Sequence, residues 1–123
     1  MNRLTRSLVV LTALALPTAA LAGHSDLQVP PADTFLLGGD QSAAMAVSGK
    51  NIGLTGVVIL ARSAASDTTI AAVVPGGSFA HTFAVGETAL IRNQSPTQTA
   101  RLSVDFTGSP ESLSMGYALP QKK

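Results

Sequence analysis

The stretch Ala100–Phe106, with the sequence Ala-Arg-Leu-Ser-Val-Asp-Phe, alternates strictly between apolar and polar side chains. A period of two residues places successive side chains on opposite faces of an extended chain. Leu102 and Val104 therefore share one face with the two ends of the stretch, while Arg101 and Asp105 point the other way. The pattern predicts a β-strand with one buried face and one face in water.

Shorter runs of the same kind recur along the chain, separated by turns rich in Gly, Pro, Asn and Asp. Their spacing of about 8 to 14 residues is typical of a sandwich or small barrel. Gly56–Arg62 differs, because its four consecutive apolar residues predict a strand covered on both faces. The other candidate strands are Thr69–Val73, Phe79–Phe83, Glu87–Arg92, Leu113–Tyr117 and two weaker runs, Asp33–Leu37 and Gln41–Ser48.

These runs together predict an all-β fold, a small antiparallel β-sandwich, Ig-like or jelly-roll-like, with about seven or eight strands. One segment leaves an alternative open. The alanine-rich run Gln41–Val47 is also compatible with one or two helical turns.

The first 22 residues have the features of a secretory signal peptide. Arg3 and Arg6 supply positive charge at its start, and Leu8–Leu16 supplies a short apolar core. That core is too short to span a bilayer of about 30 Å, so an N-terminal membrane anchor is the less favoured alternative. Pro17 and the segment Ala20-Leu21-Ala22 predict cleavage after the last of these residues. We therefore expect an exported protein, periplasmic or extracellular.

The expected organisation has four parts: the leader 1–22, a flexible N-terminal arm 23–32, a β-sandwich domain 33–118 and a polar tail 119–123. Pro30 and Pro31 interrupt the arm, and proline lacks the N–H that a central strand must donate. The apolar residues around them can then pair only at a sheet edge or with a neighbouring molecule. They form the predicted partner-binding segment, Leu27, Val29, Phe35, Leu36 and Leu37. A first strand that closes the protein's own sandwich is the alternative.

Composition and charge exclude several classes of function. The chain has 123 residues, no Cys and 12% charged residues. Without cysteine there is no disulfide, thiolate metal site or cysteine nucleophile. Loss of the leader leaves six of the eight basic residues against seven acidic ones, a net charge of −1. This balance predicts no basic patch for nucleic acid or for an anionic membrane, and no stable membrane insertion.

The two histidines are the candidate metal ligands, with copper as the candidate cofactor. His24 would stand second after cleavage, where its imidazole and the free amino terminus can bind Cu(II) together. A solvated histidine on a flexible arm is the simpler interpretation. His81 lies between two phenylalanines on one predicted strand face, which is more typical of a histidine at the core edge than of a ligand. Met45 and Met115 are the further soft donors.

In size, predicted export and absence of cysteine, the chain resembles the cysteine-free periplasmic copper carriers, which are also small exported β-sandwiches. The resemblance implies that architecture and a copper site. The chain has no His-x-Met sequence, no cluster of methionines and no histidine at the first position after the predicted cleavage. The likeness is therefore one of architecture alone.

Catalytic arrangements find less support in the sequence. There is no Gly-x-Ser-x-Gly motif, only two histidines are present to act as a base, and the acidic residues are scattered singly. Gly76 and Gly77 follow Pro75 between two predicted strands, so they indicate a turn rather than a phosphate-binding loop.

Two hypotheses about function follow. The first is an exported, non-enzymatic β-sandwich acting as a structural, interaction or assembly module, with a protein partner or self-association through an edge strand. The second is a periplasmic protein that binds a metal or small ligand through His81 and His24.

Overall fold

The computed structural model describes residues 23–64, 66–107 and 114–118. Within these ranges the chain forms nine strands and no helix. This part of the chain therefore contains no helix long and apolar enough to cross a membrane. The predicted leader, the tail 119–123 and Leu113 lie outside the described residues.

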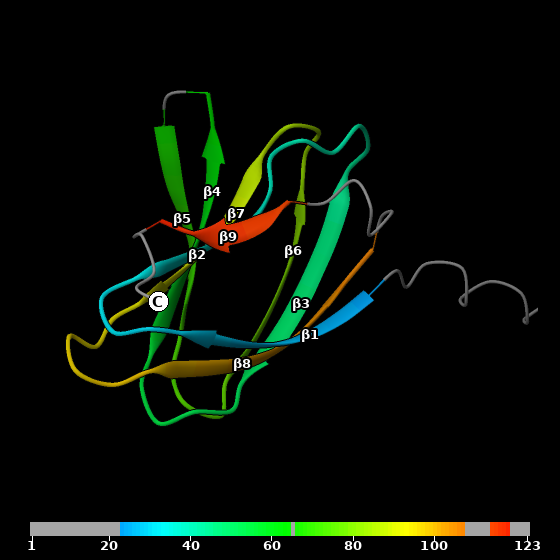
Figure 1. Cartoon of the computed structure of the whole chain (residues 1–123). Helices are drawn as coiled ribbons and strands as arrows, with labels where there is room; N and C mark the ends of the chain where they lie inside the picture. Colours follow the sequence, from blue (N-terminus) through cyan, green and yellow to red (C-terminus); the bar gives the residue numbers. More distant parts are fainter. Residues whose placement is uncertain (1–22, 65, 108–113, 119–123) are drawn as a thin grey trace, which may run out of the picture.

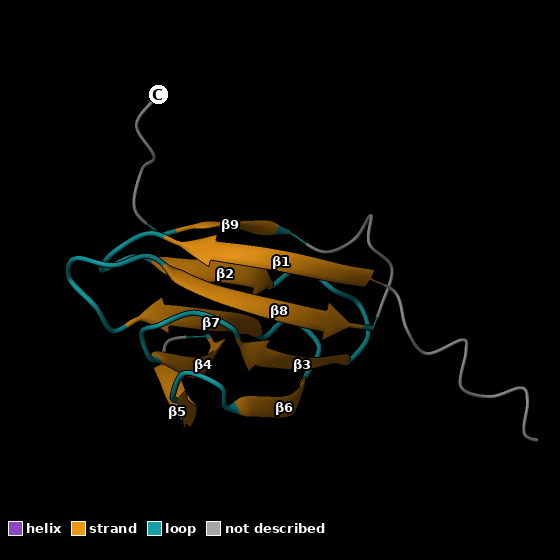
Figure 2. Ribbon diagram, turned by 90° about the horizontal axis from the view of Figure 1, so that it is seen from below, coloured by secondary structure: helices purple, strands orange, loops and turns teal. Residues whose placement is uncertain are grey.

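The strands form two antiparallel sheets that pack face to face (Figures 1 and 2). The four-stranded sheet has the order β1-β8-β3-β6, and the five-stranded sheet has the order β5-β4-β7-β2-β9. The bounds are β1 Gly23–Val29, β2 Thr34–Gly38, β3 Met45–Asn51, β4 Val57–Ser63, β5 Ser66–Val73, β6 Ser78–Phe83, β7 Thr88–Asn93, β8 Ala100–Phe106 and β9 Met115–Tyr117. The predicted all-β sandwich is confirmed, with nine described strands where seven or eight were expected.

Alternation builds the core between the sheets. β8 has the bounds predicted for it, and its four apolar residues are all at most 4% exposed. The alternating residues of the other strands fill the space from both sides. The core comprises Leu27, Val29, Phe35, Leu37, Met45, Val47, Val57, Ile59, Ala61, Val73, Phe79, Phe83, Ala89, Ile91, Ala100, Leu102, Val104 and Phe106.

The segment expected as a flexible N-terminal arm instead forms β1. It pairs with β8 in unbroken register from Gly23 opposite Phe106 to Val29 opposite Ala100. The prediction failed because the two prolines follow the strand rather than interrupt it. Leu27 and Val29 alternate into the core, with 7% and 0% of their surfaces exposed. Their burial fixes the strand at the edge of the four-stranded sheet.

The alanine-rich segment before Met45 forms no helix, so the helical alternative is wrong. Gln41, whose side chain is only 4% exposed, fixes the path of this loop. The Gln41 amide donates to the carbonyls of Ala84 (3.0 Å) and Glu87 (2.8 Å), while its oxygen accepts the N–H of Gly39 (2.7 Å). A local helix would forfeit these three bonds, two of which connect the β2–β3 loop to the β6–β7 turn.

Two buried asparagines act in the same way at the other end of the sandwich. Asn93 ends β7, and its amide nitrogen lies within 3.1 Å of the carbonyls of Val29, Pro30 and Gln98. Asn51 ends β3, and its amide reaches the carbonyls of Thr55 and Val73. Each side-chain oxygen accepts the backbone N–H two residues later. These amides satisfy carbonyls at strand ends and in the loops beside them.

The five-stranded sheet carries apolar residues on its outer face as well. Leu36, Leu90 and Leu60 lie in one row across β2, β7 and β4. Leu90 is fully buried and Leu60 is 5% exposed. β4 therefore has buried residues on both faces, as its continuous apolar run predicted.

Candidate functional site

His24 lies on the outer face of β1, between two carboxylates. Its Nδ1 is 2.7 Å from Asp105 Oδ1 on β8, and its Nε2 is 3.1 Å from Asp26 Oδ1 on β1. Ser103 Oγ is 3.5 Å from the same Nε2. The strand register brings these groups together, because His24 pairs with Asp105 and Asp26 pairs with Ser103.

The two carboxylates favour the protonated form of this imidazole. The hydrogen bond to Asp105 is the largest cause that raises the pKa of His24, and the hydrogen bond to Asp26 is the second. Half of the side chain is exposed, so water screens both interactions. The arrangement fits an imidazolium that joins two strands at a sheet edge.

His81 occupies a different environment on β6. Its ring makes an edge-to-face contact with Phe83, with centroids 4.8 Å apart and the planes at 78°. It shares the inner face of β6 with Phe79 and Phe83, which are both buried, and is itself half-buried. This is the location expected of a histidine at the rim of the core.

The structure does not bring the two histidines together. β1 and β6 are the opposite edges of the four-stranded sheet, with β8 and β3 between them. Three strand spacings of about 4.8 Å separate the two backbones, and the side chains point to opposite faces. A single site built from His24 and His81 is therefore incompatible with this fold.

Other donors do not complete a metal site in the part of the chain that the structure describes. There, no group of three or more His, Asp or Glu residues is arranged to hold a metal ion. Met45 is fully buried, and Met115 lies on β9 in the other sheet. A copper ion bound by the His24 imidazole and an amino terminus would have to displace one of the two carboxylates.

The predicted partner-binding segment lies on its own domain. Leu27, Val29, Phe35 and Leu37 are core residues, and Leu36 is half-buried in the outer leucine row. At the end of this segment Tyr117 of β9 donates its hydroxyl to the carbonyl of Gln28 (2.8 Å), which joins β1 to the second sheet. That outcome corresponds to the alternative of a strand closing its own sandwich.

The other edge of the four-stranded sheet, opposite β1, is β6. No described strand pairs with its outer side, while its inner side pairs with β3 in unbroken register. Its sequence, Ser-Phe-Ala-His-Thr-Phe, contains no Lys, Arg, Asp, Glu or Pro. Figure 2 shows β6 at the far end of its sheet from β1.

The other three edges each carry a feature that discourages pairing. β1 presents the His24–Asp26 pair, and β9 has only three residues. β5 contains a bulge opposite Ile59 and Leu60, and Asp67 at its start forms an ion pair with Arg62 at 2.8 Å. Charges, short strands and bulges are the usual devices that protect sheet edges. β6 is the described edge that has none of them.

A shallow hollow adjoins this edge on the outer face of the sheet. Its volume is about 170 Å³, and small side chains of β3, β6 and β8 line it. Those that point outward are Ala46, Ser48, Ala80, Thr82, Asp105 and Thr107. The hollow therefore lies over β3, between β6 and β8, on the side of β6 that is already paired.

Part of this arrangement was accessible from the sequence. The lack of charge in Phe79–Phe83 was visible, but edge position is a property of the whole sheet and has no local signal. Asp26 stands two residues from His24, so a strand places both on one face. Asp105 joins them only through the pairing of β1 with β8.

Comparisons with protein-family models, with curated proteins and with solved structures found no match to this chain.

Proposed function

We propose that the chain, after loss of its leader, is an exported, non-enzymatic interaction module that associates by strand addition at the edge of β6. The observation that supports this most directly is the composition of the edge, six residues without a charge, proline or bulge. Unpaired N–H and C=O groups on such an edge are a template for another strand.

The partner that we propose is a second copy of the chain. Two β6 strands can pair antiparallel about a two-fold axis, which joins two four-stranded sheets into one continuous sheet. Ala80 and Thr82 are small and exposed, so they leave the edge backbone accessible.

Sedimentation velocity of the chain from Gly23 over a concentration series tests the proposal. Wild type is expected to shift from monomer to dimer as concentration rises. Thr82→Lys places a cation on the outer face of β6, and a lysine at a sheet edge opposes the addition of another strand. It should raise the dimer dissociation constant by at least about tenfold.

Thr68→Lys is the matched control, because Thr68 is an exposed threonine on β5, the edge of the other sheet. It should dimerise as wild type does. A wild-type chain that stays monomeric throughout, or an equal loss in both variants, would overturn the assignment of β6. Circular dichroism should show the same fold for all three proteins.

A further inference from the structure

Two neighbouring loops at one end of the sandwich carry exposed aliphatic side chains. The loop 52–56 joins β3 to β4, and the turn 74–77 joins β5 to β6 (Figure 1). Leu54 is 87% exposed, Val74 is 65% exposed and Ile52 is 52% exposed. We call these three side chains the apolar tip. Isolated apolar side chains on a surface are ordinary, but three on adjoining loops give this end of the sandwich an apolar character that requires an explanation.

Hydrogen bonds around Asn51 hold the two loops beside each other. The Asn51 carbonyl accepts the N–H of Gly76 (2.8 Å), and its own N–H donates to the carbonyl of Gly77 (2.9 Å). Its side chain accepts the N–H of Gly53 (3.0 Å) and donates to the carbonyl of Thr55 (2.8 Å). These bonds brace the two loops against each other and satisfy part of their backbone.

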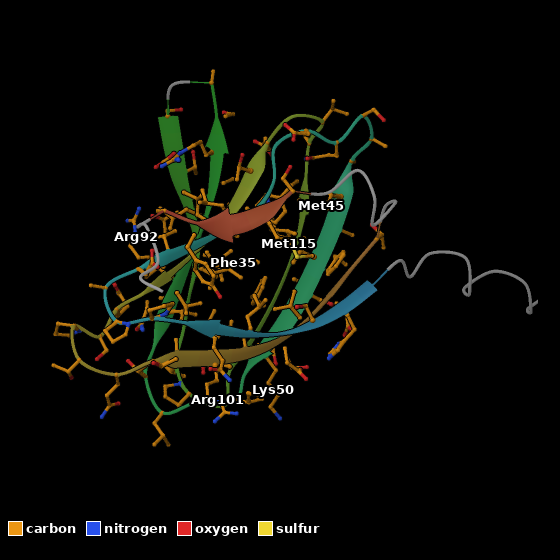
Figure 3. The ribbon with its side chains drawn as sticks, viewed as in Figure 1. Phe35, Met45, Lys50, Arg92, Arg101 and Met115 are labelled. Carbon is orange, nitrogen blue, oxygen red and sulfur yellow. The ribbon has the colours of Figure 1, made fainter. Side chains whose placement is uncertain are left out.

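Cationic side chains lie directly behind the apolar tip. Lys50 on β3 and Arg101 on β8 are exposed on the outer face of the sheet, and Figure 3 shows both at this end of the molecule. Lys50 pairs with Ser103, so Arg101 is its diagonal neighbour on the adjacent strand. Neither loop contains an acidic residue. Asp26, in the same row as Lys50 but on β1, is bonded to His24.

We propose that this end of the sandwich docks on a lipid surface with anionic headgroups. The three aliphatic side chains enter the boundary of the acyl chains, and Lys50 and Arg101 contact headgroup phosphates. The count of charges in the sequence predicted no basic patch for a membrane. The fold changes that expectation, because it places two cations beside apolar groups that supply the larger part of the binding.

The chemistry of the apolar tip favours a lipid surface over a protein partner. Protein interfaces concentrate their binding energy in aromatic residues and arginine within closely packed patches. The apolar tip has no aromatic residue, and its three side chains are 52 to 87% exposed rather than closely packed. Fluid acyl chains accept protruding aliphatic groups without shape complementarity. The side chains of the apolar tip lie outside β6, so lipid binding by the tip and self-association through β6 can be tested separately.

Vesicle flotation of the chain from Gly23 tests the inference. The probes are vesicles of phosphatidylcholine alone and of phosphatidylcholine with phosphatidylglycerol in a three-to-one mixture. Wild type should float with the mixed vesicles and lose binding as salt increases. Leu54→Ser should lower the partition coefficient by at least about tenfold. Lys50→Gln and Arg101→Gln should each lower it by roughly fivefold on the mixed vesicles.

Val85→Ser is the matched control for Leu54→Ser. Val85 is a 60% exposed aliphatic residue in the glycine-containing turn 84–87 at the opposite end of the sandwich. It should float as wild type does. Wild type that stays unbound to mixed vesicles, or equal losses in Leu54→Ser and Val85→Ser, would overturn the inference. So would a Leu54→Ser variant that keeps its vesicle binding but loses self-association in sedimentation, because that result would make the apolar tip a protein contact.

Discussion

The two edge strands of the four-stranded sheet, β1 and β6, are held in different ways. At β1, His24 bonds to two carboxylates and Tyr117 bonds to the carbonyl of Gln28. Asn93 bonds to the carbonyls of Val29, the last residue of the strand, and Pro30. At β6, two phenylalanines anchor the inner face, and the described residues add no charge, bulge or side-chain bond to the backbone of its free edge. Both strands pair with a neighbour on one side and bury apolar side chains, but β1 has additional side-chain polar contacts, and β6 has none among the described residues.

Because of this difference, the stability of an edge strand does not determine whether its backbone is free to pair with another strand. An edge fixed by its inner face can be stable and still offer its backbone to another strand. An edge strand whose surroundings are fixed by side-chain hydrogen bonds has less backbone free to pair, even where its contacts with the core are weaker. Each of the predictions below changes one side of that contrast.

The largest effect is expected from removal of β1 and β2. A chain that starts at Asp40 loses Leu27, Val29, Phe35 and Leu37, all at most 7% exposed. It also exposes β8 and separates β7 from β9. We expect an unfolded chain without a cooperative thermal transition by circular dichroism, whereas the chain from Gly23 melts cooperatively. A folded Asp40 chain would show that the first edge is an accessory rather than part of the core.

Substitution within the core of β6 should have the next largest effect. Phe83 is fully buried, so Phe83→Ala should lower the free energy of unfolding by about 3 to 5 kcal/mol in urea denaturation. Leu27→Ala on β1 is the comparison, with an expected loss nearer the lower end of about 2 to 5 kcal/mol, since Leu27 is smaller and 7% exposed. A greater loss for Leu27→Ala would show that β1 depends more on apolar burial than β6 does.

Removal of the amide behind β1 should have an intermediate effect. Asn93→Ala leaves the carbonyls of Val29, Pro30 and Gln98 without their donor. We expect a loss of about 1 to 3 kcal/mol and faster hydrogen exchange in β1 than in β6. The exposed Gln94→Ala serves as control and should change neither quantity. Exchange that rises equally in both strands would indicate general loosening instead of release of one edge.

The smallest effect concerns pH. The pKa of His24 is raised above its ordinary value near 6.5 by Asp105 first and Asp26 second. The stabilisation from this pairing is therefore fully present below about pH 6.5 and is lost as pH rises through the pKa of the folded protein. The site is exposed, so the change in global stability should be small. An NMR titration should give a lower pKa for His24 in Asp105→Asn. An unchanged pKa would show that Asp105 does not raise the pKa of His24.

Strand content could be read from the sequence where one face is buried and the other is wet. β8 agrees with its prediction at both ends because its alternation is unbroken over seven residues. β1 was missed because only Leu27 and Val29 alternate clearly within it. The two prolines after it have the same local meaning in a flexible arm as in the turn of an edge strand.

The candidate site was less accessible for a general reason. Side-chain type is local, but neighbours across a sheet depend on which strands pair. The meeting of His24 with Asp105, the separation of His24 from His81 and the exposed edge of β6 all follow from strand order. The pattern of residues in each strand is compatible with several orders, so it could not distinguish among them.

The register of β1 against β8 has a consequence for the time course of folding. Gly23 lies opposite Phe106, so the first strand of the sandwich finds its partner only after nearly the whole chain is present. Closing so long a loop costs entropy before any contact is gained, and topologies of this kind fold in milliseconds to seconds. During synthesis β1 therefore has no partner strand until β8 is complete at Phe106.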